Sequence, residues 1–200
     1  MKKAKKILVM VAALALTAAL AIGGTLAYLT STDKVENTFT VGKVAITLDE
    51  ADVKVDGTLE GTVDENRVKA NEYHLLPGHS YIKDPIIHVD AKSENCWLFV
   101  KLENQLVDII DATTIEDQMK ANGAWTLIDA TNNIYAYKDI VSAGSNVATF
   151  TNFTIKGSVD EKGLESYAGK TIVVTAYAVQ ADGFTTAEAA WTASFGAPQG

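Results

Sequence analysis

Apolar and polar residues alternate, or β-branched and aromatic residues form short runs, along much of the chain between residues 44 and 179. Both patterns are typical of β-strands, because successive side chains of a strand point to opposite faces of the sheet. Gly, Asn and Asp separate the runs, and Asn132 and Asn133 are placed as the turn of a hairpin. We predict strands over residues 44–48, 85–89, 96–102, 125–128, 134–137, 148–155 and 171–179.

Two short helices are predicted between the strands. Thr113 and Glu116, and later Thr185 and Glu188, have the spacing of a capping box at a helix start. The segment at residues 171–179 is apolar at both odd and even positions, which favours a central strand covered on both faces. The predicted fold class is therefore all-β. We expect a β-sandwich with two short helices over residues 44–196 and a tail at residues 197–200.

The N-terminus has the pattern of an export signal. Four lysines precede an apolar run of 16 residues, which is shorter than the ~20 residues of a permanent membrane span. Small residues follow the run, and we predict cleavage between Ala27 and Tyr28. Residues 1–27 are then a signal peptide that forms a signal helix. We expect the mature protein to be secreted to the extracellular space or cell surface. Only the uncleaved signal peptide is expected to contact a membrane.

The positions of the apolar residues switch from odd to even numbers near Gly42. Before it they occupy odd positions: Val35, Phe39 and Val41. After it they occupy even positions, so one strand cannot present both sets to one face without a bulge or a break. Residues 28–43 are thus predicted to be a separate strand and hinge. That strand either completes its own sheet or adds to an exposed edge of a neighbouring copy, and the second arrangement continues into a filament.

Several segments resemble one protein family. GGTLAYLTSTD (residues 23–33) and NTFTVGKV (residues 37–44) are similar to the opening of the TasA/camelysin family of bacterial exported proteins. LPG (residues 76–78), CWLFVKLEN (residues 96–104) and AYAVQ (residues 176–180) also resemble family landmarks. The resemblance implies jelly-roll-like connections, cleavage by a SipW-type signal peptidase, and a role in extracellular matrix fibres of biofilms. It also implies an alternative, because some members are metalloendopeptidases.

Charge narrows the range of partners. Without the four lysines of the signal peptide, 13 basic residues stand against 25 acidic ones, a net charge of −12 compared with −8 for the whole chain. Nucleic acid and anionic membranes are therefore unsuitable partners. Seven acidic residues fall within 17 positions, which predicts a solvated acidic loop or strand edge rather than a calcium site, since the EF-hand spacing is missing. They are Asp49, Glu50, Asp52, Asp56, Glu60, Asp64 and Glu65.

Candidate catalytic chemistry is sparse. Cys96 is the only cysteine, so the chain has no intramolecular disulfide, and its position in an apolar alternation predicts a buried side chain. No catalytic motif of the H-E-x-x-H or G-x-S-x-G type is present. The three histidines, His74, His79 and His88, lie within 15 residues and are the only candidates for a zinc site. We expect no catalytic residue and no cofactor.

The function predicted from sequence is a secreted structural protein without catalytic activity. It would be a TasA-like subunit of a biofilm fibre or surface filament, assembled by strand addition, with itself, other matrix components and the SipW-type peptidase as partners. One alternative is a camelysin-like secreted zinc metalloendopeptidase that uses some of the three histidines. Another is a monomeric adhesion module at the cell surface.

Overall fold

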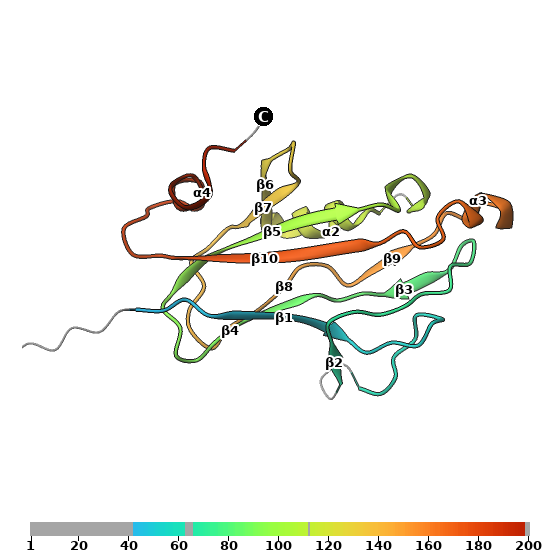
Figure 1. Ribbon diagram of the computed structural model, residues 1–200, viewed down its shortest axis with the longest axis horizontal. Coiled ribbons are helices and arrows are strands. Elements are labelled where there is room, and N and C mark those ends of the chain that lie inside the picture. The colour runs from blue at the N-terminus through green and yellow to red at the C-terminus, as the bar shows by residue number, and fades with distance from the viewer. Residues whose placement is uncertain (1–41, 63–65, 112, 199–200) are drawn as a thin grey trace, which may run out of the picture. The chain divides into compact units, whose positions relative to one another are not determined.

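The computed structural model describes residues 42–62, 66–111 and 113–198 (Figure 1). The predicted signal peptide and most of the predicted N-terminal strand lie outside these residues. In chain order the elements are β1 (Ile46–Ala51), β2 (Arg67–Val68), β3 (Ser80–Ile82), β4 (Ile86–Val89), β5 (Cys96–Asn104), η1 (Val107–Ile109), α2 (Ile115–Lys120), η2 (Ala121–Gly123), β6 (Trp125–Asp129), β7 (Ile134–Tyr137), β8 (Asn146–Ala148), β9 (Asn152–Thr154), α3 (Glu161–Glu165), β10 (Ile172–Gln180) and α4 (Ala187–Phe195).

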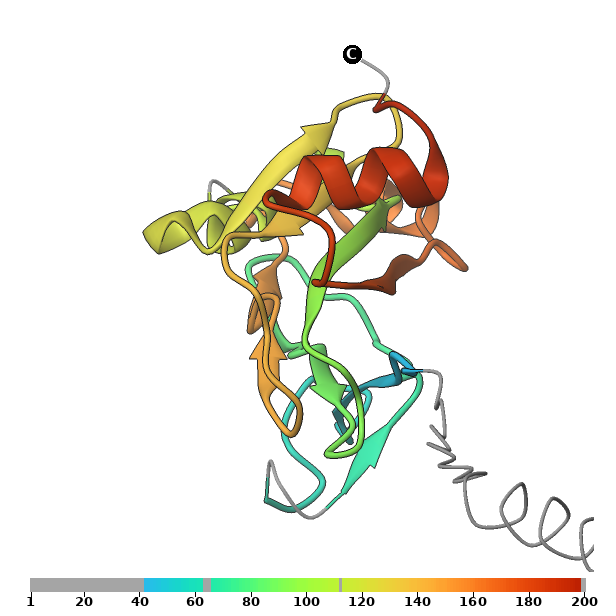
Figure 2. The same cartoon turned by 90° about the vertical axis from the view of Figure 1, so that its left-hand side faces the viewer.

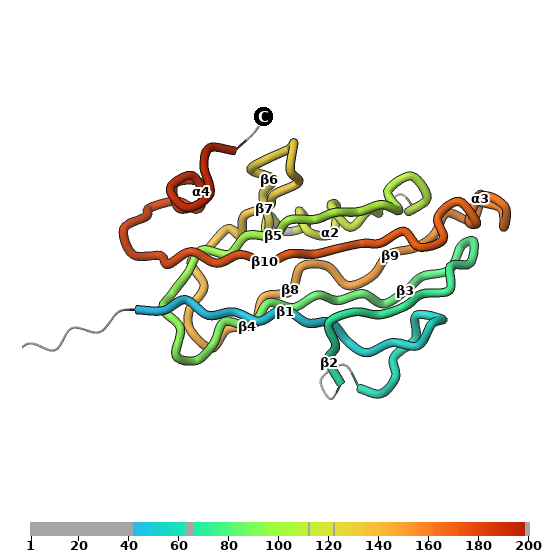
Figure 3. Tube along the Cα trace, viewed as in Figure 1, coloured from blue at the N-terminus to red at the C-terminus, as the bar shows by residue number. Residues whose placement is uncertain are grey.

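The strands form two antiparallel sheets and one further pair. One sheet has the order β2-β1-β4-β8, the other has the order β10-β5-β7-β6, and β3 pairs with β9. The chain passes from one sheet to the other between β4 and β5 and returns between β7 and β8 (Figure 3). The predicted all-β class is confirmed, whereas the jelly-roll-like connections stay a prediction.

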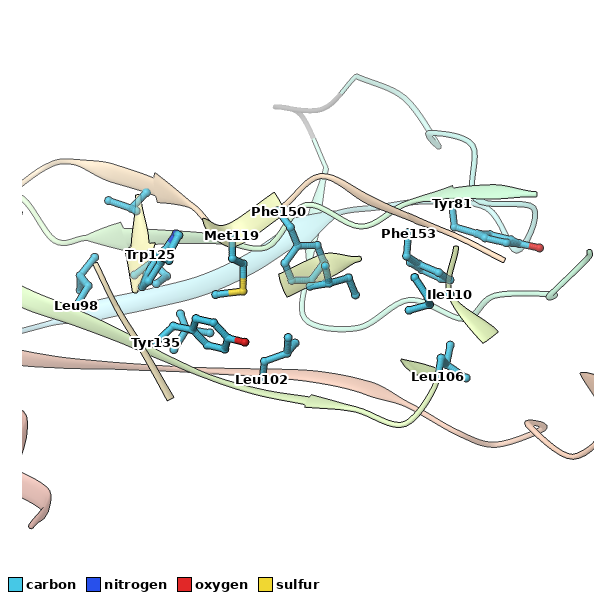
Figure 4. Packing of buried hydrophobic residues seen from close by; sticks show 14 of the residues in the cluster. Tyr81, Leu98, Leu102, Leu106, Ile110, Met119, Trp125, Tyr135, Phe150 and Phe153 are labelled. Atoms are coloured by element: carbon cyan, nitrogen blue, oxygen red, sulfur yellow. The ribbon is translucent and has the colours of Figure 1, made fainter. Parts of the chain in front are cut away.

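The main core lies between the two sheets. In β5, the alternate residues Cys96, Leu98, Val100 and Leu102 are buried in this core. Inward-facing residues of β1 and β4 pack against it from the other sheet, as the alternation of apolar residues requires. Aromatic and aliphatic side chains continue the core past Tyr135 and towards β3 and β9 (Figure 4). Each large apolar side chain buried in this way contributes about 1.5–3 kcal/mol.

A smaller cluster covers the opposite face of β5. Its centre is Phe99, whose ring centroid lies 5.1 Å from that of Trp191 in α4. Figure 2 shows α4 lying over the sheet that contains β5. Trp191 of the C-terminal helix, which is 7% exposed, thus packs on this face of the sheet.

Helix starts differ from the prediction by one residue. The cap of α2 is Thr114, whose hydroxyl accepts from the backbone of Asp117 while the Asp117 carboxylate accepts from the Thr114 N–H. α4 begins after Thr186 in the same way, without the predicted capping box. Two adjacent threonines offer the same chemistry, so spacing alone does not select between them. α3, capped by Asp160, was not predicted.

Two strand predictions are corrected. The segment predicted as one strand at residues 148–155 contains the end of β8 and all of β9, which belong to different sheets, and buried Phe150 lies between them. β10 was predicted to be central, yet among the described residues it is the edge strand of its sheet. Apolar residues on both faces report what covers a strand from above and below. They do not report whether a second strand lies beside it.

Candidate functional site

β10 presents an open edge. Its nine residues pair with β5 in one continuous register, from Ile172 opposite Asn104 to Gln180 opposite Cys96. Within the described residues, no strand pairs with its other side. An antiparallel edge strand leaves alternate N–H and C=O groups directed away from its sheet. β10 therefore offers a long main-chain surface for another strand.

The usual protections of an edge strand are absent from β10. Its sequence, IVVTAYAVQ, contains no charged residue and no proline. Its register with β5 contains no bulge, and Val173 is 43% exposed. Natural edge strands are normally short, bulged, or interrupted by Lys or Pro, since such features prevent pairing with other chains. The sequence of β10 is suited to being covered by a further strand.

β1 lies beside β10 and also has an incomplete edge (Figures 1 and 3). On the side opposite β4, β2 pairs only with Glu50 and Ala51. The stretch of β1 from Ile46 to Asp49 has no strand partner on that side in the described part of the chain. Within the described residues, two strands that each lack a strand partner along part of one edge are thus neighbours.

A cleft of about 1420 Å³ opens next to these strands. Leu48 of β1 and Ile172 and Val174 of β10 line it, together with α3 and the segment that connects β2 to β3. Its apolar lining is continued by Leu75, Leu76, Leu106, Phe153 and Leu164. Charged residues of both signs also line it: Glu50, Lys69, Glu72, Lys83, Glu161, Glu165 and Lys170. The cleft can accommodate apolar side chains of an extended segment.

A charged cluster lies on the outward face of β1. Arg67 donates through Nε to Asp49 and through Nη1 to Asp84, 3.2 Å away. His88 Nε2 lies 2.9 Å from the same Asp49 oxygen, and its Nδ1 lies 2.8 Å from Asn146 Oδ1. Burial opposes ionisation of Asp49, but the hydrogen bonds and charges of Arg67 and His88 outweigh it and hold the pKa of Asp49 below its ordinary value. This cluster stabilises the junction of β1, β2 and β4.

A second polar group lies on the inward side of β1. Lys83 Nζ donates to Glu50 Oε2 at 2.5 Å, and Asn71 Nδ2 donates to Glu50 Oε1 at 2.9 Å. Glu50 and Lys83 are only 4% and 8% exposed. The predicted solvated acidic loop or edge is therefore wrong at its start, because Glu50 is buried and both Asp49 and Glu50 are paired with cations. Asp64 and Glu65 lie outside the described residues.

The pairing of Glu50 with Lys83 was not predicted, although the sequence contains a signal for it. Glu50 continues the core-facing set of even positions in β1, and Lys83 occupies the same parity as buried Tyr81 and Ile87. A charge at a core-facing position of each of two strands is expected to be paired, since an isolated buried charge is very costly. Neither Asn71 nor Arg67 has a comparable local signal.

The three histidines have different surroundings. His74 is exposed and precedes a turn that includes Pro77 and Gly78. His79 stacks edge-on against Tyr81 and contacts the carbonyl oxygen of Asp56 at 2.8 Å, whereas His88 belongs to the charged cluster. Among the residues described, no three His, Cys, Asp or Glu side chains form a group able to hold a metal ion. The histidines stay untested as candidates for zinc binding, and the absence of a cofactor stays a prediction.

Other predicted site residues are only partly placed. Ala27, Tyr28, Val35, Phe39 and Val41 lie outside the described residues. Gly42 is described, and a Cβ added there would lie 2.9 Å from the carboxylate of Glu94, at the end of a flexible side chain. Its role as a hinge stays a prediction.

Cys96 is fully buried, as predicted, and burial raises the pKa of its thiol to about 11.

Comparisons with known proteins give one match. Searches of curated proteins and of solved structures found none. None of the helices in the described ranges has the length and apolar character needed to cross a membrane. The model of the camelysin metallo-endopeptidase family matches residues 2–68, which include β1 and β2. The resemblance of this chain to the TasA/camelysin family is thereby confirmed over its N-terminal third.

Proposed function

We propose that this protein is a secreted structural subunit that assembles into fibres of an extracellular matrix or biofilm by strand addition. Residues 28–41 of one copy pair with the open edge of β10 in the next copy. The observation that carries this proposal is the uncharged nine-residue edge of β10 beside a cleft that is lined in part by apolar side chains. An exposed edge of this kind is an aggregation hazard unless a specific partner covers it.

The donor segment has the pattern that this edge requires. Val35, Phe39 and Val41 alternate with polar residues, so one side of an extended segment is apolar. Main-chain hydrogen bonds to β10 supply affinity, and the apolar side chains enter the cleft near Ile172 and Val174. Polar side chains of the other parity then face water.

The arrangement of donor and acceptor favours a filament. The donor precedes β1 in the chain, while the acceptor is the last strand of the fold, so the two copies contribute different surfaces. Such a heterologous contact leaves one donor and one acceptor free at the ends, and the chain of copies continues. Cleavage beside Tyr28 by a SipW-type peptidase releases the donor segment, which couples export to assembly. Other matrix components join through the fibre, and no catalytic step is required.

The donor side is tested by Phe39→Asp. A buried unpaired aspartate costs several kcal/mol, so filaments of this variant should disappear in sedimentation and electron microscopy. If the strand joins a neighbour, circular dichroism shows an unchanged melting temperature of the monomer. Unchanged sedimentation together with a large fall in melting temperature contradicts assembly by strand addition and leaves a strand that completes its own sheet.

The acceptor side is tested by Val173→Lys. A lysine on the exposed edge opposes pairing with another strand without altering the core, because Val173 is already 43% exposed. Val107→Lys is the matched control, since Val107 is 50% exposed in η1, outside the strands. Filaments should be lost with the first variant and kept with the second. If both variants form filaments, or if both fail to form them, the acceptor strand is not β10.

A secreted metalloendopeptidase is the second candidate, favoured by the description of the matching family. It would bind zinc through some of His74, His79 and His88. This function predicts casein hydrolysis by the monomer that stops with a chelator and with simultaneous replacement of the three histidines by alanine. Our proposal predicts no hydrolysis and intact fibres in the triple variant. A monomer with neither property would be an adhesion module.

A further inference from the structure

Lys83, Glu50 and Asn71 form a group that ordinary fold stability does not require. Replacing a buried ion pair by apolar residues is often neutral or stabilising, because removing two charges from water costs about as much as their attraction returns. Lys83 and Glu50 are nonetheless nearly inaccessible to water. A lysine amine held in such a place is also a nucleophile once it loses a proton.

The Asn71 side chain is held in one orientation. Its Oδ1 accepts from the backbone N–H of Val53 at 3.0 Å, and its Nδ2 donates to the carbonyl oxygen of Ala51 at 2.9 Å as well as to Glu50. The N–H of Val53 polarises the amide carbonyl and would stabilise negative charge on Oδ1. These contacts fix the positions of the amide oxygen and of the amide nitrogen, which is the leaving group in an attack on Cγ.

Glu50 touches both partners of a possible reaction. One carboxylate oxygen contacts the Lys83 amine, and the other contacts the Asn71 amide nitrogen. The two nitrogens are therefore separated by one carboxylate. Tyr73 lies in the same poorly solvated region, since burial and then the charges of Glu50 and Asp84 raise the pKa of its phenol.

We propose that Lys83 and Asn71 become joined by an intramolecular isopeptide bond, with Glu50 as the proton carrier. Glu50 takes one proton from the Lys83 ammonium, which leaves a neutral amine and a neutral carboxylic acid. The amine attacks Cγ of Asn71, and the N–H of Val53 holds the resulting oxyanion. Glu50 then gives its proton to Nδ2 and accepts the second proton from Nζ.

Atoms and charge balance in this step. The Nζ–Cγ bond forms and the Cγ–Nδ2 bond breaks, with ammonia as the leaving group and no change of oxidation state. Ammonia takes the carboxyl proton and departs as ammonium, so Glu50 returns to its ionised form. The adjoining cleft, which Lys83, Glu50 and Asn71 all line, gives the product a route to solvent.

The bond would take the place of a disulfide. Cys96 is the only cysteine in the chain, so no disulfide can form within it. A link from Asn71 to Lys83 closes a loop that includes the turn at residues 76–78 and one wall of the cleft. Closing a loop destabilises the unfolded chain and slows local opening. This inference does not depend on fibre assembly, because the bond lies within one copy.

Peptide mass spectrometry of the purified protein tests the proposal. Trypsin does not cut after an acylated lysine, so the expected product is a peptide of residues 70–92 with an uncut Lys83, lighter than its sequence mass by one ammonia. Fragmentation should give no backbone cleavage products between Asn71 and Lys83. A peptide of residues 70–83 at its full sequence mass overturns the proposal, and so does a loss of water that maps to Lys83 and Glu50.

Variants separate the chemistry from folding. Glu50→Gln keeps the size of the side chain but cannot carry the proton, so the mass loss should vanish while circular dichroism stays that of a folded sandwich. Lys83→Arg likewise removes the nucleophile, and Lys69→Arg is the matched control that keeps the cross-link. Asn71→Asp should give the same bond with loss of water in place of ammonia. A mass loss that persists in Lys83→Arg contradicts the assignment.

Discussion

At the scale of single residues, Arg67 is the centre of the charged cluster. It joins Asp49 of β1 to Asp84, and it also donates through Nη2 to the carbonyl oxygens of both residues. Asp84 in turn accepts from the backbone N–H of Ala51 at 2.7 Å. The two carboxylates and the guanidinium thus hold β2 and the segment between β3 and β4 against β1.

The lowered pKa of Asp49 predicts a dependence of stability on pH. A carboxyl group with a folded-state pKa below its ordinary value of 3.8 stabilises the fold fully above that value. This contribution is lost as the pH falls from 3.8 through the lower pKa of the folded state. Asp49→Asn should reduce the free energy of unfolding by about 2 kcal/mol at neutral pH and by less at about pH 3.

Urea unfolding followed by circular dichroism at the two pH values measures this difference. Asp139→Asn is a suitable control, because the Asp139 side chain is 69% exposed and its loss should change stability at neutral pH by less than about 0.5 kcal/mol. An equal effect of Asp49→Asn at both pH values would show that the ionised form of Asp49 contributes nothing.

At the scale of elements, the sequence predicted those elements whose formation depends on neighbouring residues in the chain. The hairpin of β6 and β7 was expected from Asn132 and Asn133, and Asn133 indeed has φ 53°, a value that asparagine tolerates. β2 and β3 were missed because each has few residues and forms only where a distant strand provides hydrogen bonds. The candidate site depends on such distant partners, so its edge and its buried cluster were not foreseen.

The cap of α2 gives a prediction that separates the structure from the sequence pattern. Thr114→Ala removes the hydroxyl that accepts from Asp117 and should lower the free energy of unfolding by about 1 kcal/mol. Thr113→Ala, the matched control at the adjacent exposed residue, should change it by only a few tenths. Thermal unfolding of both variants checks this, and a larger loss in Thr113→Ala would favour the cap predicted from sequence.

At the scale of the whole molecule, Cys96 reports on global opening. It is fully buried between the sheets and its N–H and C=O both bond to Val141, so no small local movement exposes it. Burial also raises the pKa of its thiol to about 11, which keeps it protonated near neutral pH.

A thiol reagent should therefore react with the native protein only at the rate of unfolding. In urea, the Cys96 thiol should become reactive with the same midpoint concentration at which circular dichroism shows loss of the strands. Rapid reaction in buffer alone would mean that β5 separates from its neighbours without global unfolding, contrary to the extent of its pairing.

The continuous register of β5 and β10 also has a mechanical consequence. Nine successive residue pairs join the two strands, and antiparallel hydrogen bonds run perpendicular to the strand direction. Tension applied along β10 therefore shears all these bonds together, whereas a force across the sheet would break them one after another. Under tension along the strands, β5 and β10 separate only when all their hydrogen bonds break together. We therefore expect this strand pair to resist a larger force along its strands than across them.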